Sequence, residues 1–306
     1  MPQHAFLDEL SRLGPDAPLA HGMPLEAAQR YCRQLARNHY ENFTVVSWMV
    51  PRELAPHFCS IYAWCRWADD LADEVGDTNR SLQLLYWWEA QLNDLYAGRL
   101  PTHPVYVALQ ETIEKFDLPQ RCFLDLLTAF KQDQWQTRYE THEALITYCQ
   151  HSANPVGRLI LHLGRCHRAD TGRLADSICT GLQLANFWQD VRSDYERGRI
   201  YIPKKDQAHF GFTEPDFARK RSTGPFMRLL GYEVKLARRF LEGGIPLVKM
   251  VPAPLSLSVQ LFIDGGLAIL EAIERQEYDV WKRRPRIGSL KKLALVWNAW
   301  WNTGGT

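Results

Sequence analysis

The stretch FCSIYAWCRWADDLADEV, residues 58–75, begins as an apolar run and ends in a group of acids. Apolar residues in and just before it recur at alternating spacings of four and three, which predicts one buried stripe on an α-helix over residues 51–75. This stripe consists of Leu54, Phe58, Ile61, Cys65, Ala68 and Ala72. Residues 58–68 contain a single charged side chain, Arg66, so the predicted helix is apolar nearly all round before the acids begin. We therefore expect a core helix whose acidic end projects into an enclosed space.

A second segment, residues 174–194, repeats this design. Residues 177–189, SICTGLQLANFWQ, carry no charge, and Asp190 and Asp194 then follow. Gln183, Asn186 and these two aspartates are separated by three, four and four residues, so they share one helical face. The sequence predicts a polar stripe on an otherwise buried helix.

The remaining chain predicts an all-α fold. From residue 23 onward, segments of helical periodicity alternate with Pro and Gly breaks, and strand patterns are nearly absent. About ten helices are expected, and no linker, repeat or composition shift divides them. We predict a loose leader over residues 1–22 and a single all-α domain with a helical bundle core over residues 23–306.

Composition limits the classes of partner. The 306 residues carry a formal net charge of +1, which argues against nucleic acid as the main partner. Seven scattered cysteines without a Cys-x-x-Cys pair indicate reduced core residues and not a disulfide frame or a zinc site. Neither a signal peptide nor a membrane-spanning helix is indicated, so we expect a cytoplasmic protein.

The two acidic segments indicate a magnesium-bound diphosphate. Asp69 and Asp73, like Asp190 and Asp194, are four residues apart, so each pair presents two carboxylates one helical turn apart. Two such pairs facing each other across a bundle would repel strongly unless cations lay between them. Hard oxygen ligands suit Mg²⁺, which completes its coordination with water and phosphate oxygens.

The acids allow two other interpretations. A single D-D-x-x-D-E run on a helix is most often a solvated face, but here a second pair occurs on a second uncharged helix. A di-iron carboxylate bundle would need Glu-x-x-His pairs, and none accompanies these acids. Arg197 and Arg199 follow the second acidic segment and could bind either phosphate or the aspartates, and both interpretations stay open.

Three segments together resemble the squalene/phytoene synthase family. They are IYAWCRWADDLADE (residues 61–74), GLQLANFWQDVRSD (residues 181–194) and RGRIYIP (residues 197–203). The resemblance covers about residues 26–295. It implies an all-α isoprenoid-synthase fold with a central cavity and head-to-head prenyl chemistry on a diphosphate substrate.

The resemblance also implies roles for individual residues. The implied Mg²⁺ ligands are Asp69, Asp73, Asn186, Asp190 and Asp194, with Asp70 beside them in the catalytic motif. The candidate substrate contacts are Arg66, Gln183, Asn186, Arg197, Arg199, Tyr201 and, by a looser match to the family, Arg284 and Lys292. Tyr62 and Tyr148 match tyrosines that line the reaction cavity, Tyr148 being proposed to steer the cation or assist proton transfer.

One departure from the family pattern narrows the choice of reaction. Residues 152–157 read SANPVG, where members that make squalene or phytoene usually show an apolar-Ala-Gly-x-Val-Gly stretch. With NFTVVSW at residues 42–48 and RWA at residues 66–68, this resembles the bacterial hydroxysqualene synthase branch of hopanoid biosynthesis. That branch implies ionisation of presqualene diphosphate, rearrangement and capture of water to give hydroxysqualene, without NADPH.

Pro155 is expected to kink its helix by freeing the carbonyl of His151. Our hypothesis is that Asn154, or this carbonyl, positions the water that quenches the cation. The alternative is that Asn154 and Pro155 only shape the helix.

The C-terminal segment, residues 281–301, is basic and then aromatic. Such a segment can rest in a membrane interface, although packing and diphosphate binding would explain its basic half equally well. A peripheral contact with the inner face of the membrane would suit a lipid substrate handed over by a presqualene diphosphate synthase.

Two rival functions stay open. The first is head-to-head condensation of two farnesyl or geranylgeranyl diphosphates to presqualene diphosphate, squalene or phytoene. The second is a non-catalytic assembly factor of the same fold. Such a factor need not keep all four aspartates of the two pairs, and their presence favours an enzyme.

Overall fold

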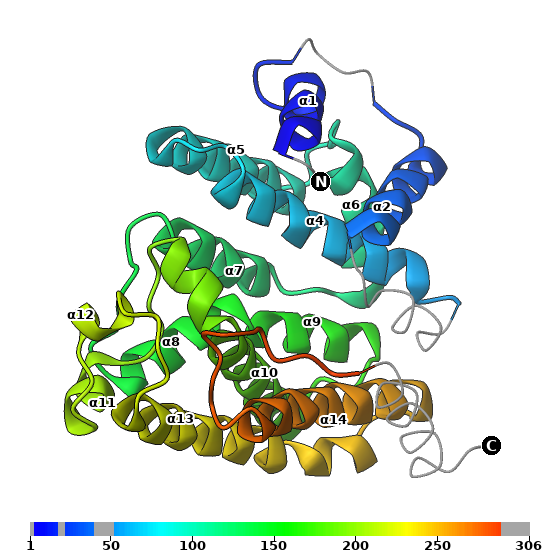
Figure 1. The fold of residues 1–306 in the computed structure, drawn as a ribbon. Helices are drawn as coiled ribbons and strands as arrows, with labels where there is room; N and C mark the ends of the chain where they lie inside the picture. The colour runs from blue at the N-terminus through cyan, green and yellow to red at the C-terminus, as the bar shows by residue number, and fades with distance from the viewer. Residues whose placement is uncertain (1–2, 18–21, 40–51, 289–306) are drawn as a thin grey trace. The chain divides into compact units, whose positions relative to one another are not determined.

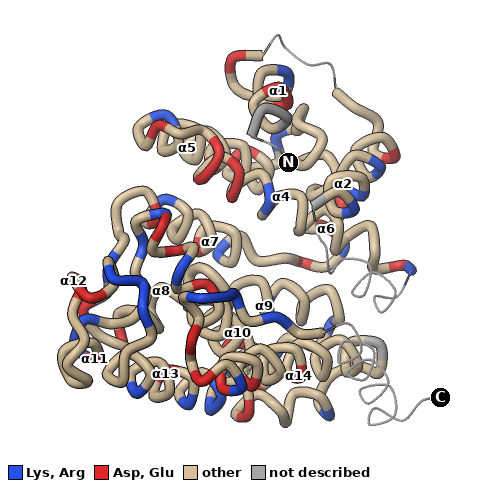
Figure 2. The backbone as a smooth tube through the Cα atoms, in the orientation of Figure 1, with Lys and Arg blue, Asp and Glu red and all other residues tan. Residues whose placement is uncertain are grey.

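The computed structural model describes residues 3–17, 22–39 and 52–288. Within these ranges the chain is helical, and the β-pairing is confined to an isolated bridge between Arg138 and Ile200. The predicted all-α class is confirmed. By compactness the chain forms two units, residues 1–135 with 159–166 and residues 136–158 with 167–306. Basic and acidic residues are interspersed along the chain in both (Figure 2). The predicted single domain over residues 23–306 stays a prediction.

Helix α4 (Ala55–Asp73) organises the first unit, because it contacts four other helices of that unit. These are α2 (Leu25–His39), α5 (Thr78–Tyr96), α6 (Pro104–Phe116) and α7 (Gln120–Gln132). The sequence predicted a loose leader before residue 23, whereas the structure places helix α1 (Gln3–Leu13) there (Figure 1). Phe6 of α1 is buried, with its ring edge against Trp67 of α4. Leu10 and Leu13 also pack against the core, so the apolar face of α1 holds it there.

A group of tryptophans holds α4 in place. Trp64, Trp67 and Trp88 are almost completely buried, and the rings of Trp67 and Trp88 stack with centroids 5.5 Å apart. The indole N–H of Trp64 donates to the Tyr106 hydroxyl over 3.0 Å, and that of Trp67 donates to the Tyr31 hydroxyl over 2.8 Å. Large aromatic side chains with satisfied polar atoms contribute heavily to core stability. Much of the aromatic content of this unit is therefore packing, and it fixes the helix that carries the first acids.

The acidic end of α4 is followed by a sharp turn. Gly76 adopts φ 79°, a left-handed conformation that glycine tolerates without steric cost. Asp77 then caps α5 by accepting a hydrogen bond from the backbone N–H of Arg80 over 2.7 Å. The helix therefore stops directly after its acids.

Helix α10 (Ala169–Glu196) organises the second unit and is longer than the predicted residues 174–194. It packs against α8 (His142–Ser152), α13 (Gly224–Gly243), the 3₁₀ turn η1 (Ile245–Lys249) and α14 (Ala253–Arg275) (Figure 1). The short helices α11 (Lys204–His209) and α12 (Glu214–Phe217) complete the unit, and α9 (Asn154–Leu163) has residues in both units. A Cβ atom on Gly181 would lie 2.7 Å from Cγ of Leu241, so glycine permits the close approach of α10 and α13.

The predicted kink at Pro155 is instead a break between two helices. Helix α8 ends with Ala153 as its C-cap, and α9 begins at Asn154. Proline is favoured in the first turn of a helix, where its missing N–H leaves no internal bond unmade. Pro155 therefore starts α9.

Helix α14 is the described segment that is long and apolar enough to cross a membrane by length and composition, over residues 255–275. The sequence predicted no membrane-spanning helix. Core helices of soluble proteins can have the same length and composition, and 44% of the apolar window is buried here. Residues 42–48, Lys292 and the aromatic part of the C-terminal segment lie outside the described residues.

Candidate functional site

The first acidic group lies at the C-terminal end of α4. Tyr62, Arg66, Asp69 and Asp73 follow spacings of four, three and four, so they form one stripe on the helix. The stripe is half-buried to exposed, whereas the opposite face, with Trp64 and Leu71, is completely buried. The predicted substrate and metal residues of this unit therefore share the accessible side of a core helix.

Asp70 lies beside this stripe and is only 2% exposed. The guanidinium group of Arg66 donates two hydrogen bonds to its carboxylate, one of them from Nε over 3.0 Å. Nη1 of Arg66 also donates to Oδ2 of Asp69 over 3.2 Å. Forked contacts of this kind fix the arginine in one orientation. In this structure Asp70 orients Arg66, and Arg66 in turn holds Asp69.

The second acidic group lies on α10. Asn186 is exposed, and Gln183, Asp190 and Asp194 are half-buried. Arg284 donates to both oxygens of Asp190, from Nη2 over 2.8 Å and from Nε over a shorter distance, and Nη2 also donates to Gln189. The amide of Gln189 donates to the carbonyl of Pro285 over 2.6 Å, so the chain around residues 284–285 is held on α10. Arg284 and Lys292 are the two basic residues with the looser match to the family. Of these, Arg284 lies at the acidic residues of α10.

A left-handed turn brings Arg199 back toward Asp194. Gly198 adopts φ 81°, and the N–H of Arg199 donates to the carbonyl of Asp194 over 2.8 Å, which closes the C-terminus of α10. Asp194 and Arg199 line a small hollow of about 10 Å³ between α10 and residues 199–202. Arg197 is exposed at the helix C-cap. Within this unit the predicted residues Asp190, Asp194, Arg199 and Arg284 thus lie close together.

The electrostatics of this group favour a bound cation. Burial, with the negative charge of Asp190, raises the pKa of Asp194 to about 7, although Arg197, Arg199 and Arg284 oppose the shift. At neutral pH Asp194 is therefore partly protonated unless another positive charge is supplied. The accessible oxygen atoms of this group belong to carboxylates and side-chain amides, which are the ligands that Mg²⁺ prefers. The residues present fit a magnesium ion.

An aromatic group lies beside this hollow. The rings of Phe187 and Tyr201 stack with centroids 3.7 Å apart, and the Tyr148 ring lies 6.2 and 6.1 Å from theirs. Tyr139 joins the group, its ring 5.8 Å from that of Tyr201. Tyr148 and Tyr201 were predicted from the sequence, whereas Tyr139 and Phe187 were not. Phe187 could have been predicted, because it directly follows the candidate ligand Asn186. No sequence feature near Tyr139 indicates that it belongs to this aromatic group.

Asn154 is 3% exposed, and its side-chain oxygen accepts a hydrogen bond from the Thr180 hydroxyl over 3.0 Å. This bond ties the start of α9 to α10. This contact fits the alternative that Asn154 shapes the helix, and its role in positioning water stays a prediction.

Comparison with known proteins identifies the family. The family model for squalene/phytoene synthase matches residues 36–291. A phytoene synthase from Arthrospira platensis is 30% identical over 282 residues, which cover 87% of this chain and 90% of that protein. The crystal structure of squalene synthase HpnC from Alicyclobacillus acidocaldarius is 43% identical with a TM-score of 0.80, and the match covers 84% of this chain and 97% of that one.

A dehydrosqualene synthase crystallised with a ligand is 24% identical with a TM-score of 0.84, covering 92% of this chain and 98% of that one, and it shows the shared fold. The match to the family model spans most of the chain and includes all three segments on which the resemblance rested. The chain therefore belongs to the squalene/phytoene synthase family.

Proposed function

We propose that this chain is a hydroxysqualene synthase, which converts presqualene diphosphate and water into hydroxysqualene and diphosphate. The observation that carries the diphosphate chemistry is the half-buried Asp190–Asp194 pair with Arg284 and Arg199 beside it. The choice of the hydroxysqualene synthase branch is supported by the SANPVG segment at residues 152–157. It is also supported by 43% identity to a protein named squalene synthase, compared with 30% to a phytoene synthase.

The polar residues of both acidic groups act on the diphosphate in this proposal. Asp69 and Asp73 in one unit, and Asp190, Asp194 and Asn186 in the other, are the candidate Mg²⁺ ligands. Mg²⁺, when bound, neutralises the diphosphate and so favours its departure. Arg66, Gln183, Arg197, Arg199, Tyr201, Arg284 and Lys292 are the candidate substrate contacts. In the described structure Arg284 binds Asp190, and a guanidinium group can transfer from carboxylate to phosphate without changing its hydrogen-bond geometry.

The aromatic residues act on the cation. When the C–O bond of presqualene diphosphate breaks, its electron pair leaves with the diphosphate and a carbocation remains. The faces of Tyr148, Tyr201 and Phe187, with Tyr62 in the other unit, can stabilise that charge and limit the access of water. After rearrangement, one water adds through its oxygen and releases a proton, which balances the reaction.

Asn154 is our candidate for positioning this water. Its oxygen is engaged by Thr180, so its amide N–H groups are the atoms that would hold the water oxygen. In the variant Asn154→Gly we expect products of proton loss to appear beside the alcohol. Detection of the alcohol as the sole product would contradict this role.

The cellular setting follows from the substrate. We propose a cytoplasmic enzyme that receives presqualene diphosphate from its synthase, with a peripheral membrane contact through the C-terminal segment. Sedimentation with phospholipid vesicles, comparing the full chain with one truncated after Leu290, tests that contact. Equal sedimentation of the two chains would contradict it.

A second candidate is the condensation of two farnesyl or geranylgeranyl diphosphates. It is favoured by the relatives named phytoene synthase, of which the cyanobacterial example spans 87% of this chain. Both reactions begin with the departure of diphosphate, so the acidic groups alone do not separate them.

The deciding experiment supplies Mg²⁺ with presqualene, farnesyl or geranylgeranyl diphosphate in separate reactions, each with and without NADPH. We expect an alcohol from presqualene diphosphate, in equal yield with and without NADPH. Turnover of farnesyl or geranylgeranyl diphosphate without turnover of presqualene diphosphate would refute the proposal and support condensation. Absence of turnover with every substrate would favour a non-catalytic relative.

A further inference from the structure

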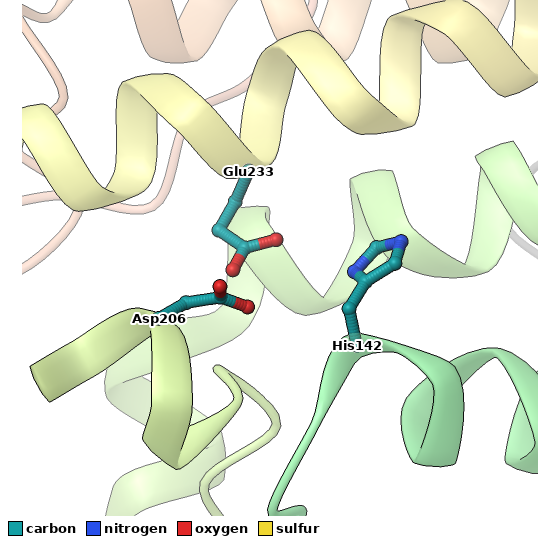
Figure 3. Close-up of side chains that lie close together, drawn as sticks. All are labelled: His142, Asp206 and Glu233. Atoms are coloured by element: carbon teal, nitrogen blue, oxygen red, sulfur yellow. The ribbon is translucent and has the colours of Figure 1, made fainter. Parts of the chain in front are cut away.

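Three potential metal ligands meet in the second unit at a place that the diphosphate chemistry does not use. His142 lies at the start of α8, Asp206 on α11 and Glu233 on α13. One ligand atom from each lies within 4.8 Å of the other two. Figure 3 shows the carboxyl groups of Asp206 and Glu233 pointing toward each other, with the imidazole of His142 facing them.

The burial of Glu233 makes this arrangement costly without a positive charge. Glu233 is 0% exposed, and neither of its carboxylate oxygens receives a hydrogen bond from a donor among the described residues. Oδ2 of Asp206 and Nδ1 of His142 are also buried and lack such a partner. Burial and the proximity of Asp206 raise the pKa of Glu233 well above its usual value. Either a proton or a cation must therefore lie between the two carboxyl groups.

The donor set favours a cation of the zinc class over magnesium. Imidazole nitrogen and carboxylate oxygens are all ligands of Zn²⁺, and a water would complete a four-coordinate site, whereas Mg²⁺ prefers oxygen ligands alone. Burial lowers the pKa of His142, which keeps its imidazole neutral, as a metal ligand must be. With bonds of about 2.1 Å, two ligands of one zinc ion lie at most about 4.2 Å apart. Small side-chain rotations would close the 4.8 Å cluster to that size.

We propose that His142, Asp206 and Glu233 bind one Zn²⁺ ion that joins α8, α11 and α13. The three helices belong to the same unit, so the site needs no contribution from elsewhere. The metal stabilises the fold in this proposal, and it is separate from the Mg²⁺ proposed for the aspartate pairs.

The test measures zinc retention by the full chain. Protein stripped with a chelator is dialysed against micromolar Zn²⁺ in the presence of millimolar Mg²⁺, which competes for the oxygen-only sites. We expect elemental analysis to find one tightly held zinc per chain in the wild type and in Glu242→Gln, a control at an exposed position of α13. Zinc affinity should fall at least about tenfold in Glu233→Gln and in His142→Ala.

Thermal unfolding supplies a second measurement. Zn²⁺ should raise the melting temperature of the wild type and of Glu242→Gln, and should leave that of Glu233→Gln unchanged. If Glu233→Gln does not fold, the half-exposed His142→Ala decides the matter. Two results would overturn the proposal: no zinc retained by the wild type, which would indicate a proton shared by the two carboxyl groups, or equal retention by Glu233→Gln and Glu242→Gln. Asp190→Asn should keep its zinc, so this outcome is independent of the proposed reaction.

Discussion

The two acidic helix ends balance their charges in different ways. On α4 the counter-charge is local, because Arg66 binds Asp70 four residues later on the same helix. On α10 Asp190 is bound by Arg284, which lies 94 residues later in the sequence, while Arg197 and Arg199 at the end of the same helix offset part of the charge of Asp194. The Arg66–Asp70 pair therefore joins residues of one helix, whereas the pairing of Asp190 depends on tertiary structure. The α10 group also retains a carboxyl group, Asp194, whose pKa of about 7 leaves it sensitive to pH and to cations.

The largest expected effect tests the local pair on α4. Asp70→Asn removes the buried partner of Arg66, and the free energy of unfolding should fall by about 3 kcal/mol, because an ion pair with a buried member loses most when one partner is removed. Asp69→Asn is the matched control, since its side chain is 44% exposed, and it should cost less than about 1 kcal/mol. Urea unfolding of both variants measures the difference. Equal losses would mean that α4 does not depend on this pair.

The next largest effect is on catalysis. It tests whether the acidic groups of α4 and α10 contribute equally to the rate. Asp194→Asn and Asp73→Asn should each lower kcat at least about 100-fold at saturating Mg²⁺, because each removes a candidate metal ligand. Ser193→Ala, on the same turn of α10, should leave the rate within about twofold. Diphosphate release from presqualene diphosphate provides the assay. Full activity in Asp73→Asn alone would restrict the metal chemistry to α10.

These differences also show where sequence-based prediction succeeds and where it stops. The periodicity of residues 54–72 and 177–194 predicted both core helices and the polar faces of their ends, because local spacing determines which side chains share a helical face. The pairing of Arg284 with Asp190 joins segments 94 residues apart, and helical spacing carries no information about such contacts. The same holds for Tyr139, which joins the aromatic group through packing alone.

The Asn154-Pro155 pair illustrates a subtler limit. Proline inside a helix and proline at the start of a new helix give the same local sequence signal. The structure shows the second arrangement, in which Asn154 is held by Thr180 of α10. The burial of Phe6 against Trp67 likewise orders a segment whose composition suggested a loose leader.

A pH-dependent effect follows from the raised pKa of Asp194. A carboxyl group whose pKa is higher in the folded than in the unfolded state stabilises the fold at low pH, and this contribution is lost as the pH rises through the folded pKa of about 7. Without metal, the free energy of unfolding of the wild type should therefore fall relative to that of Asp194→Asn between pH 5 and pH 8. Added Mg²⁺ should remove this difference and release protons near pH 7. Parallel pH profiles for the two proteins would contradict the assignment.

The smallest effect compares the two arginines directly. The Arg284 and Asp190 side chains are 51% and 24% exposed, so a double-mutant cycle with Arg284→Ala and Asp190→Ala should give a coupling energy below about 1 kcal/mol. Because water and ions reach this pair, the coupling should decrease further in about 1 M salt. The corresponding cycle for Arg66 and Asp70 should give a larger coupling that changes little with salt, since Asp70 is buried. A weakly coupled Arg284 can exchange Asp190 for a phosphate at little cost, which is the behaviour that the proposed reaction requires of it. A large, salt-independent coupling between Arg284 and Asp190 would instead assign this arginine to the fold and leave Arg199, which lines the hollow with Asp194, as a guanidinium for the diphosphate.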